Sequence, residues 1–273
     1  TQFFLKDDLG LEPAVAQLVL TTAHLPWNVK PLYGMVSDNF ALCGTKRQSY
    51  LIVATILGAG SLFGMAWLAQ TAAIASVFLF TNNLSVAVSD VVMDAKVVEE
   101  ARKEPEDGAG NLQSFSWTVL SAGGLIGSAA AGVAIVTIGP RAVFYVMAAV
   151  TALVVLAVRF LEETPVTDEP VGCGPCCKQL GAVLRTLRNP LIFRPTLWIF
   201  LSTACSPSFY TFMFYFYTDE LHIEPTFIAT LNVVGYAALI VGNVLYNAYL
   251  KKVSFRVIFF WAQLAHALMS LLE

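Results

Sequence analysis

Long apolar segments recur along the whole of this 273-residue chain. A membrane-spanning helix needs about 20 mostly apolar residues, and about eight segments meet this requirement. They are residues 13–36, 50–68, 71–92, 112–138, 142–160, 195–218, 226–250 and 257–272. Such unbroken runs lack the alternation of a membrane β-barrel, so they predict an all-α integral membrane protein. Residues 1–5 are expected to be the stub of a preceding helix.

The composition supports a membrane protein and excludes several other classes. Hydrophobic residues make up 57% of the chain and charged residues 13%, with a mean hydropathy of +0.67, whereas soluble domains carry about a quarter charged residues. A net charge of -3 gives no sign of nucleic-acid binding. The five cysteines form no disulfide framework. No catalytic triad, phosphate loop or metal-ligand motif is present, so we expect neither an enzyme nor a bound cofactor or metal.

Lysine and arginine are distributed unevenly over the loops between these segments. They gather after the first, third, fifth and seventh segment: Lys46, Arg47, Arg102, Lys103, Arg159, Lys178, Arg185, Arg188, Arg194, Lys251, Lys252 and Arg256. The alternate loops are poor in basic residues, and the one at residues 219–224 is acidic. Because cytoplasmic loops carry an excess of lysine and arginine, the basic loops are predicted to face the cytoplasm or its organellar equivalent.

One loop, after residue 161, is longer than the others and contains the run CGPCC at residues 173–177. Counting the stub, six predicted helices precede it and three follow it, and many transporters consist of two six-helix halves. We therefore predict an N-terminal transmembrane half at residues 1–161 with most of its first helix missing. Residues 162–194 form a linker on the cytoplasmic side, and residues 195–273 form the first three helices of a C-terminal half.

Lys30 lies inside the first apolar segment, in the sequence LPWNVKPLYG. A charge near the centre of a membrane helix costs about 2.5–3.5 kcal/mol on insertion scales, and such residues usually face a bundle interior or an aqueous cavity. Pro26 and Pro31 are expected to kink this helix, which suits a cavity. The alternative is that Lys30 snorkels to the nearer membrane surface. We interpret Lys30 as a candidate substrate-binding residue.

Three polar residues share one face of the helix predicted from residue 71. Asn83, Asp90 and Asp94 follow the spacing i, i+7 and i+11. Carboxylates in membrane helices are costly and are functional candidates by default. Asp90 and Asp94 are therefore candidate proton-coupling residues, and Asn83 and Asp90 are candidate substrate-binding residues. Lys30 is a candidate counter-ion of Asp90, and the alternative is that both aspartates lie in the cytoplasmic interface.

Small residues four apart occur in the segments at 50–68 and 112–138. They are Gly60 and Gly64, and then Gly123, Gly127, Ser128 and Gly132. Such spacing lets two helices approach closely, so these residues are predicted to pack helices together and not to bind a ligand.

Residues 34–51, GMVSDNFALCGTKRQSYL, resemble the loop between helices two and three of the major facilitator superfamily. With the preceding W..KPLYG..SD pattern, the chain resembles the folate–biopterin transporter family. Four further segments agree, in the right order: LKDDLGLEPA, SDVVMDAKVVEEAR, NPLIFRPTLWIF and FYFYTDELHIEP. The resemblance covers most of the chain and implies a major-facilitator-type helical bundle.

The resemblance implies secondary active transport of folate- or pterin-like organic anions, by alternating access and coupled to protons. Its expected partners are a folate or pterin, protons and membrane lipid, in a plastid membrane or the plasma membrane, with the basic loops on the cytoplasmic or stromal side. Two alternatives stay open. One is a major-facilitator carrier of another organic solute, and the other is a transporter-like scaffold or accessory subunit of a larger membrane complex.

Further residues become candidates within this interpretation. Gln113 and Trp117 lie near the start of the segment at 112–138, and Tyr210 and Phe214 share a face of the segment at 195–218. All four are candidate substrate-binding residues, because a planar pterin can stack on aromatic rings. Asp38, Lys46 and Arg47 are expected to act as a gate at the cytoplasmic mouth: Asp38 ends one helix, and Lys46 and Arg47 precede the next.

Overall fold

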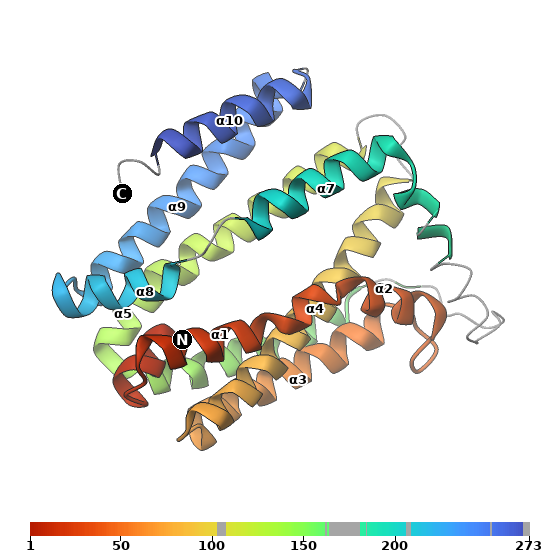
Figure 1. Cartoon of the computed structure of the whole chain (residues 1–273). Coiled ribbons are helices and arrows are strands. Elements are labelled where there is room, and N and C mark those ends of the chain that lie inside the picture. The colour runs from red at the N-terminus through yellow and green to blue at the C-terminus, as the bar shows by residue number, and fades with distance from the viewer. Residues whose placement is uncertain are drawn as a thin grey trace. The chain divides into compact units, whose positions relative to one another are not determined.

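The computed structural model describes residues 1–102, 108–161, 163, 181–183, 185–205, 209–251 and 253–269. The helices in chain order are η1 (Phe4–Asp8), α1 (Pro13–Asn28), α2 (Lys30–Asn39), α3 (Gln48–Leu68), α4 (Ala72–Ala101), α5 (Gly108–Val158), α7 (Pro190–Ala204), α8 (Tyr210–Tyr215), η2 (Phe216–Glu220), α9 (Pro225–Leu245), η3 (Tyr246–Leu250) and α10 (Phe255–Met269). The described residues contain no β-strand (Figure 1). The predicted all-α class is therefore confirmed. The CGPCC run and most of the predicted linker lie outside the described residues.

Within the described ranges, four helical segments are long and apolar enough to cross a membrane. They are α3, α4, Gly110–Val158 of α5, and Pro225–Leu250, which joins α9 to η3. α5 is divided by Gly139, which has φ 81° and ψ 160° and precedes Pro140. This break falls in the loop predicted between residues 138 and 142. The protein is an integral membrane protein, and the count of about eight full spans stays a prediction.

The first predicted span is divided into α1 and α2 at Val29, which has φ −109° and ψ 16°. Pro31 has no amide hydrogen, and its ring crowds the preceding turn. The amide of Val29 donates to the carbonyl of Pro26 at 3.4 Å, and that of Leu32 donates to the carbonyl of Val29 at 2.9 Å. The expected proline kink is thus present, and it makes Lys30 the first residue of α2.

The described chain forms two compact units. The first unit comprises Thr1–Glu99 and Ala134–Glu224, and so contains α1 to α3, nearly all of α4, the second part of α5, α7, α8 and η2. The second unit comprises Glu100–Val133 and Pro225–Glu273, and contains the first part of α5 with α9, η3 and α10. The division into halves at residues 1–161 and 195–273 stays a prediction.

Small residues bring α3 and α4 together in the first unit. Ser85 Oγ of α4 donates to the Ala54 carbonyl of α3 at 2.6 Å. A Cβ added to Gly64 would lie only 2.3 Å from the ring of Phe78, whereas one added to Gly60 would meet no described residue within 4 Å. Gly64 therefore permits the close packing that the sequence predicted, because any larger side chain would displace the Phe78 ring.

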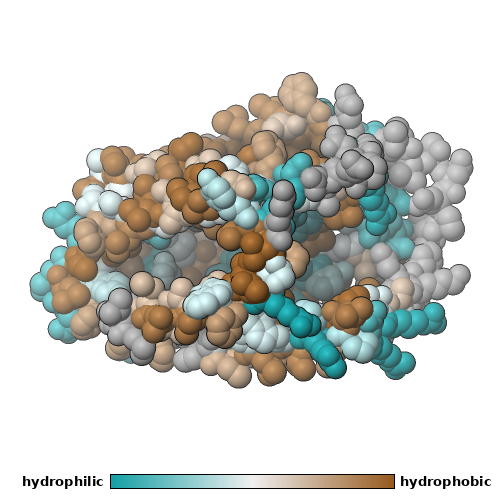
Figure 2. Space-filling view, turned by 90° about the horizontal axis from the view of Figure 1, so that it is seen from above, coloured by the Kyte–Doolittle hydropathy of each residue, from teal (hydrophilic) through white to brown (hydrophobic). Residues whose placement is uncertain are grey.

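Large apolar side chains are exposed over much of the surface (Figure 2). Leu18 is 66% exposed, Trp67 63% and Leu153 62%. A soluble monomer rarely exposes large contiguous apolar patches. Lipid tails are as apolar as these side chains, so their exposure agrees with a membrane environment.

In the second unit, glycines of α5 pack against α9. A Cβ added to Gly124 would lie 2.4 Å from the Tyr236 ring, and one added to Gly132 would lie 2.5 Å from the Cβ of Ala229. A Cβ on Gly123 would meet nothing within 4 Å among the described residues. The predicted close packing at Gly132 is confirmed. The prediction for Gly123 is wrong, because the neighbouring Gly124 makes the close contact with α9.

Candidate functional site

Lys30 and Asp90 form an ion pair in the first unit. Lys30 begins α2 and Asp90 lies in α4, and Lys30 Nζ donates to Asp90 Oδ2. The side chains are 28% and 35% exposed, so both charges are partly removed from water. Burying an unpaired charge is costly, and in this pair each residue neutralises the charge of the other. The counter-ion expected for Asp90 is therefore present.

A second contact runs beside this ion pair. Trp27 Nε1 donates to Asn83 Oδ1 at 2.9 Å, and Asn83 Nδ2 donates to the carbonyl of Leu79 at 2.9 Å. Lys30 Nζ lies 5.0 Å from the centroid of the Trp27 ring, within the range of a cation–π interaction. We call Trp27, Lys30, Asn83 and Asp90 the membrane polar cluster.

Asp94 follows Asp90 by one turn of α4, and it is exposed. Asp90 and Lys30 lie close enough for their charges to act on its carboxylate. The structure thus places Asp94 close to the charged end of the membrane polar cluster. The proton-coupling roles of Asp90 and Asp94 stay predictions.

Gln113 and Trp117 belong to the second unit, on the first part of α5, and both are exposed. The adjacent residue Ser114 faces η3 and donates its Oγ hydrogen to Asn247 Oδ1 at 3.2 Å. The contact between α5 and η3 thus uses the helix face beside Gln113 and Trp117. Their predicted contact with substrate stays a prediction.

Arg47 joins the ends of three helices. It precedes α3 and is only 8% exposed. Its Nη2 donates to Asp38 Oδ1 at 2.8 Å and to Glu99 Oε1 at 2.7 Å, and its Nη1 donates to Ser37 Oγ at 3.1 Å. Burial opposes the positive charge, but hydrogen bonds to Glu99 and Asp38 outweigh it and raise the pKa of Arg47. We call Ser37, Asp38, Arg47 and Glu99 the Arg47 cluster.

Glu163 caps the N-terminus of α3. Its carboxylate accepts hydrogen bonds from the amides of Lys46 at 2.8 Å, Arg47 at 2.9 Å and Gln48 at 2.8 Å. The first amides of a helix have no partner within the helix, and the positive end of the helix dipole also favours a carboxylate. Lys46, a predicted gating residue, thus contributes its backbone amide to this cap.

The two aromatic candidates of α8 have different surroundings. Tyr210 is 66% exposed, whereas Phe214 is 5% exposed. The Phe214 ring meets that of Phe3 edge-on, with centroids 4.9 Å apart. In this structure Tyr210 is accessible and Phe214 belongs to the core. Their role in stacking on a ligand stays a prediction.

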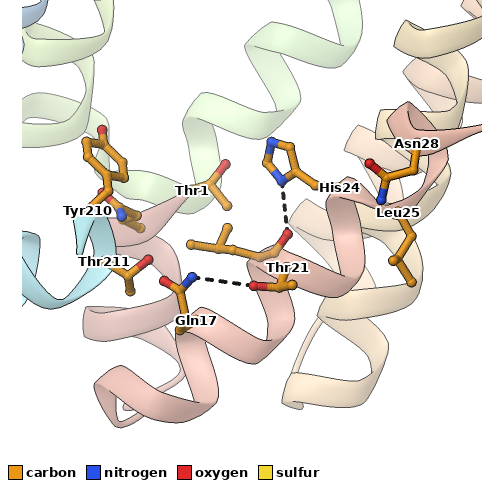
Figure 3. A pocket seen from close by; sticks show the side chains of 10 residues that line it. Thr1, Gln17, Thr21, His24, Leu25, Asn28, Tyr210 and Thr211 are labelled. Atoms are coloured by element: carbon orange, nitrogen blue, oxygen red, sulfur yellow. Dashed lines mark hydrogen bonds between the residues drawn. The ribbon is translucent and has the colours of Figure 1, made fainter. Parts of the chain in front are cut away.

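A cavity of about 690 Å³ lies beside α1 and α8 in the first unit (Figure 3). Its polar lining residues are Thr1, Gln2, Gln17, Thr21, His24, Asn28, Tyr210 and Thr211. His24 Nδ1 lies 2.9 Å from the Leu20 carbonyl oxygen, and Gln17 Nε2 donates to Thr21 Oγ1 at 3.4 Å. The volume of this cavity and its lining do not by themselves assign a ligand.

Three important contacts were missed from the sequence. The sequence patterns predict neither the contact of Glu99 with Arg47, nor the cap by Glu163, nor the Trp27–Asn83 hydrogen bond. Glu99 is separated from Arg47 by 52 residues and Glu163 by 116. No local pattern joins residues so far apart. The one sequence signal for the Glu163 contact was that two glutamates, Glu162 and Glu163, follow the fifth apolar segment, on the membrane side predicted for the basic loops.

Comparison with known proteins identifies one matching family model, described as the BT1 family, over residues 1–273. The chain is 37% identical over 270 residues to the Folate-biopterin transporter of Synechocystis sp., covering 98% of this chain and 54% of that protein. It is 28% identical over 331 residues to Probable folate-biopterin transporter 4 of Arabidopsis thaliana, covering 98% and 67%.

Another similar protein is Probable folate-biopterin transporter 9, chloroplastic, of Arabidopsis thaliana. The identity is 27% over 279 residues, covering 97% of this chain and 51% of that protein. The chain spans about half the length of the Synechocystis relative and of this one. No solved structure matches the chain.

Proposed function

This chain belongs to the BT1 family, and from this membership we propose that the protein is a secondary active transporter of folate- or pterin-like organic anions. The names of the relatives from Synechocystis and Arabidopsis support this substrate class. They are named as transporters, which also supports a protein that moves its substrate without changing it chemically.

The observation that carries the proposal is the Lys30–Asp90 ion pair, which joins α2 to α4, a helix long and apolar enough to cross a membrane. Ionisable residues inside membrane segments are rare, pair with one another, and mark substrate paths and proton relays. The hydrogen bond of Trp27 to Asn83 holds a second polar contact beside the pair. A cation and a carboxylate at one place in the membrane suit a site that exchanges an anion and a proton.

In the proposed cycle, a proton neutralises Asp90 and leaves Lys30 without its counter-ion. Lys30 then attracts the carboxylate of a folate or the acidic edge of a related anion, because opposite charges stabilise each other in a poorly hydrated site. When Asp90 releases the proton, the ion pair with Lys30 forms again and displaces the anion. Proton and anion therefore travel together, as in a symporter.

The other candidate residues take supporting roles in this proposal. Asn83 is proposed to hydrogen-bond the substrate, and Tyr210 and Phe214 to stack on its ring. Asp94 is proposed as a second proton site beside Asp90. Substrate contacts within the second unit are proposed for two residues, Gln113 and Trp117.

Alternating access is proposed with a major-facilitator arrangement, in which the Arg47 cluster closes the cytoplasmic or stromal side. The plastid envelope is one proposed location, because a relative is named chloroplastic, and the plasma membrane is the other. Labelling of single cysteines at Thr45 and Ile223 tests the orientation. Position 45 should react with an impermeant reagent only from the cytoplasmic or stromal side, and reaction from the opposite side would show an inverted topology.

Uptake of folate and biopterin into liposomes containing the full-length protein tests the transport function. Asp90→Asn mimics the protonated carboxyl and cannot release a proton. It should abolish uptake driven by a pH gradient and leave some substrate exchange at equal pH, whereas Asp94→Asn should have a smaller effect. Full pH-driven uptake by Asp90→Asn would remove Asp90 from the mechanism.

Absence of uptake by the wild type would favour an accessory subunit or scaffold of a larger complex. Uptake of some other organic anion, without folate or biopterin, would retain the transport function and overturn the substrate class.

A further inference from the structure

A second group of charged residues lies at the other end of α3 from the Arg47 cluster. Arg47 precedes α3, whereas Arg141 donates to the carbonyls of Ala66 at 3.4 Å and Ala69 at 3.0 Å, near the C-terminus of α3. α3 has 21 residues, so it is about 30 Å long, which is close to the thickness of the hydrocarbon core. The two groups therefore belong to opposite faces of the membrane.

Arg141 anchors the segment around Asp8 to the end of α3. Arg141 Nε donates to Asp8 Oδ2 at 3.3 Å, and the guanidinium lies 5.3 Å from the centroid of the Phe4 ring. A cation at a helix C-terminus is favoured by the helix dipole. Phe4 and Leu5 are fully buried. Residues 4–8 are thus held against the N-terminal half by several contacts.

From this anchored segment, Lys6 reaches a part of the chain more than 200 residues away. Lys6 Nζ donates to Thr218 Oγ1 at 2.6 Å over a separation of 212 residues, and it forms an ion pair with Asp219. Close by, the Tyr215 hydroxyl donates to the Leu11 carbonyl at 2.6 Å. These contacts join residues before the predicted linker to residues after it.

The Arg47 cluster differs in this respect. Its members Ser37, Asp38, Arg47 and Glu99, and the capping residue Glu163, all precede residue 164. The Lys6 contacts instead connect the two predicted halves, so they must change if the halves rock against each other. Lys6 is 18% exposed and Asp219 51% exposed, and water-accessible ion pairs are weak enough to break during a transport cycle.

We propose that Lys6, Thr218 and Asp219 form an outer gate, which closes the membrane face opposite the Arg47 cluster and opens when Lys6 separates from Asp219. The Asp8–Arg141 contact holds Lys6 in place while Asp219 moves with the later helices. This inference rests on the proposed function, because alternating access requires a gate on each face.

The test measures opening directly, in the full-length protein with its native cysteines replaced by serine. The reporter is a cysteine at Thr211, which is 3% exposed and lies one turn before Tyr215 on α8. A membrane-impermeant maleimide is added to each side in separate samples. Lys6→Glu brings like charges together and should raise the labelling rate from the outer side about tenfold.

Charge exchange provides the specific control. Lys6→Glu combined with Asp219→Lys should return labelling to about the wild-type rate, within two- to three-fold. Lys6→Glu combined with Glu220→Lys should not, although it carries the same charges, because the ion pair of Lys6 is with Asp219 and Glu220 lies outside the proposed gate. Unchanged labelling in Lys6→Glu, or equal rescue by both partners, would overturn the gate.

Two further measurements keep the result unambiguous. If Lys6→Glu does not fold, Lys6→Gln and Asp219→Asn replace it, and each should raise the labelling rate above that of Glu220→Gln. Equal labelling rates would overturn the gate.

Folate uptake by the wild type is measured in the same vesicles. If the wild type takes up no folate but the variants label as expected, the proposed function is overturned and the gate is retained. If the wild type takes up folate but the variants do not label as expected, only the gate is overturned.

Discussion

Lys30 and Asp90 form an ion pair that joins α2 to α4 across 60 residues of sequence. The side chains are 28% and 35% exposed, so both charges are partly removed from water and each stabilises the other. Removing one partner of a buried pair costs about 3–5 kcal/mol, whereas replacing both with apolar residues is often neutral. This difference gives a prediction that does not depend on transport.

Asp90→Leu should lower the free energy of unfolding by about 1–3 kcal/mol, since it leaves Lys30 unpaired at a partly exposed site. The double variant Lys30→Met/Asp90→Leu should recover at least half of this loss. Thermal unfolding in detergent, followed by tryptophan fluorescence, measures both. Asp94→Leu is the matched control and should have a smaller effect, because Asp94 is exposed. No recovery in the double variant would mean that Asp90 stabilises the fold by other contacts.

Asp38→Asn should slow transport while it leaves the equilibrium affinity for substrate within a few-fold. The reason is that Asp38 contacts Arg47 at the end of α2, away from the membrane polar cluster. Exchange rates in liposomes and equilibrium binding in detergent separate the two effects. Arg47→Lys should act in the same direction, because an ammonium cannot reproduce the guanidinium contacts with Asp38 and Glu99. A large loss of affinity at an unchanged exchange rate would contradict the gating role.

Gly124→Val should destabilise the second unit by about 1–3 kcal/mol, as overpacking does. A Cβ at this position lies 2.4 Å from the Tyr236 ring, which would have to move. Gly123→Val is a neighbouring control with the same chemical change, and its Cβ meets nothing within 4 Å in the described chain. Thermal unfolding of the two variants gives the comparison. Equal destabilisation would show that helix propensity, and not the contact with α9, determines the effect.

Asp7→Asn should raise the thermal stability at neutral pH. Burial raises the pKa of Asp7 above its usual value of 3.8, Lys6 partly opposes this, and the charges of Asp8 and Asp219 add to it. A raised pKa in the folded state means that folding favours the protonated carboxyl, so the wild type loses stability as the pH rises through that pKa. The variant does not titrate at this position.

The stability difference between Asp7→Asn and wild type should therefore be smallest near pH 3 to 4 and increase above it, by about the amount set by the pKa shift. Melting temperatures between acid and neutral pH measure this. Asp8→Asn is the opposite control: it removes the ion pair with Arg141 and should lower stability at neutral pH. A stability difference for Asp7→Asn that falls as the pH rises would contradict the assigned sign.

Much of the architecture was predictable from local sequence patterns. Long apolar segments predicted helices, because lipid leaves backbone groups no other partners. The gap between the segments at 112–138 and 142–160 predicted a break, which the structure has at Gly139. Pro31 predicted the kink before Lys30, because proline alters the helix backbone wherever it occurs. The spacing of Asn83 and Asp90 placed them on one face of α4, and both indeed contact the segment around Lys30.

The tertiary structure decided which residues pair across helices. Neighbouring positions on an α-helix point about 100° apart, so the rotation of α5 against α9 determines that Gly124, and not Gly123, meets Tyr236. Arg47 contacts Glu99, which lies 52 residues away, and Lys6 contacts Thr218, which lies 212 residues away. Sequence alone therefore determined the helices, their breaks and the charged positions within them. Which charges neutralise each other followed only from how the helices pack, because such contacts depend on distance in space and not on spacing along the chain.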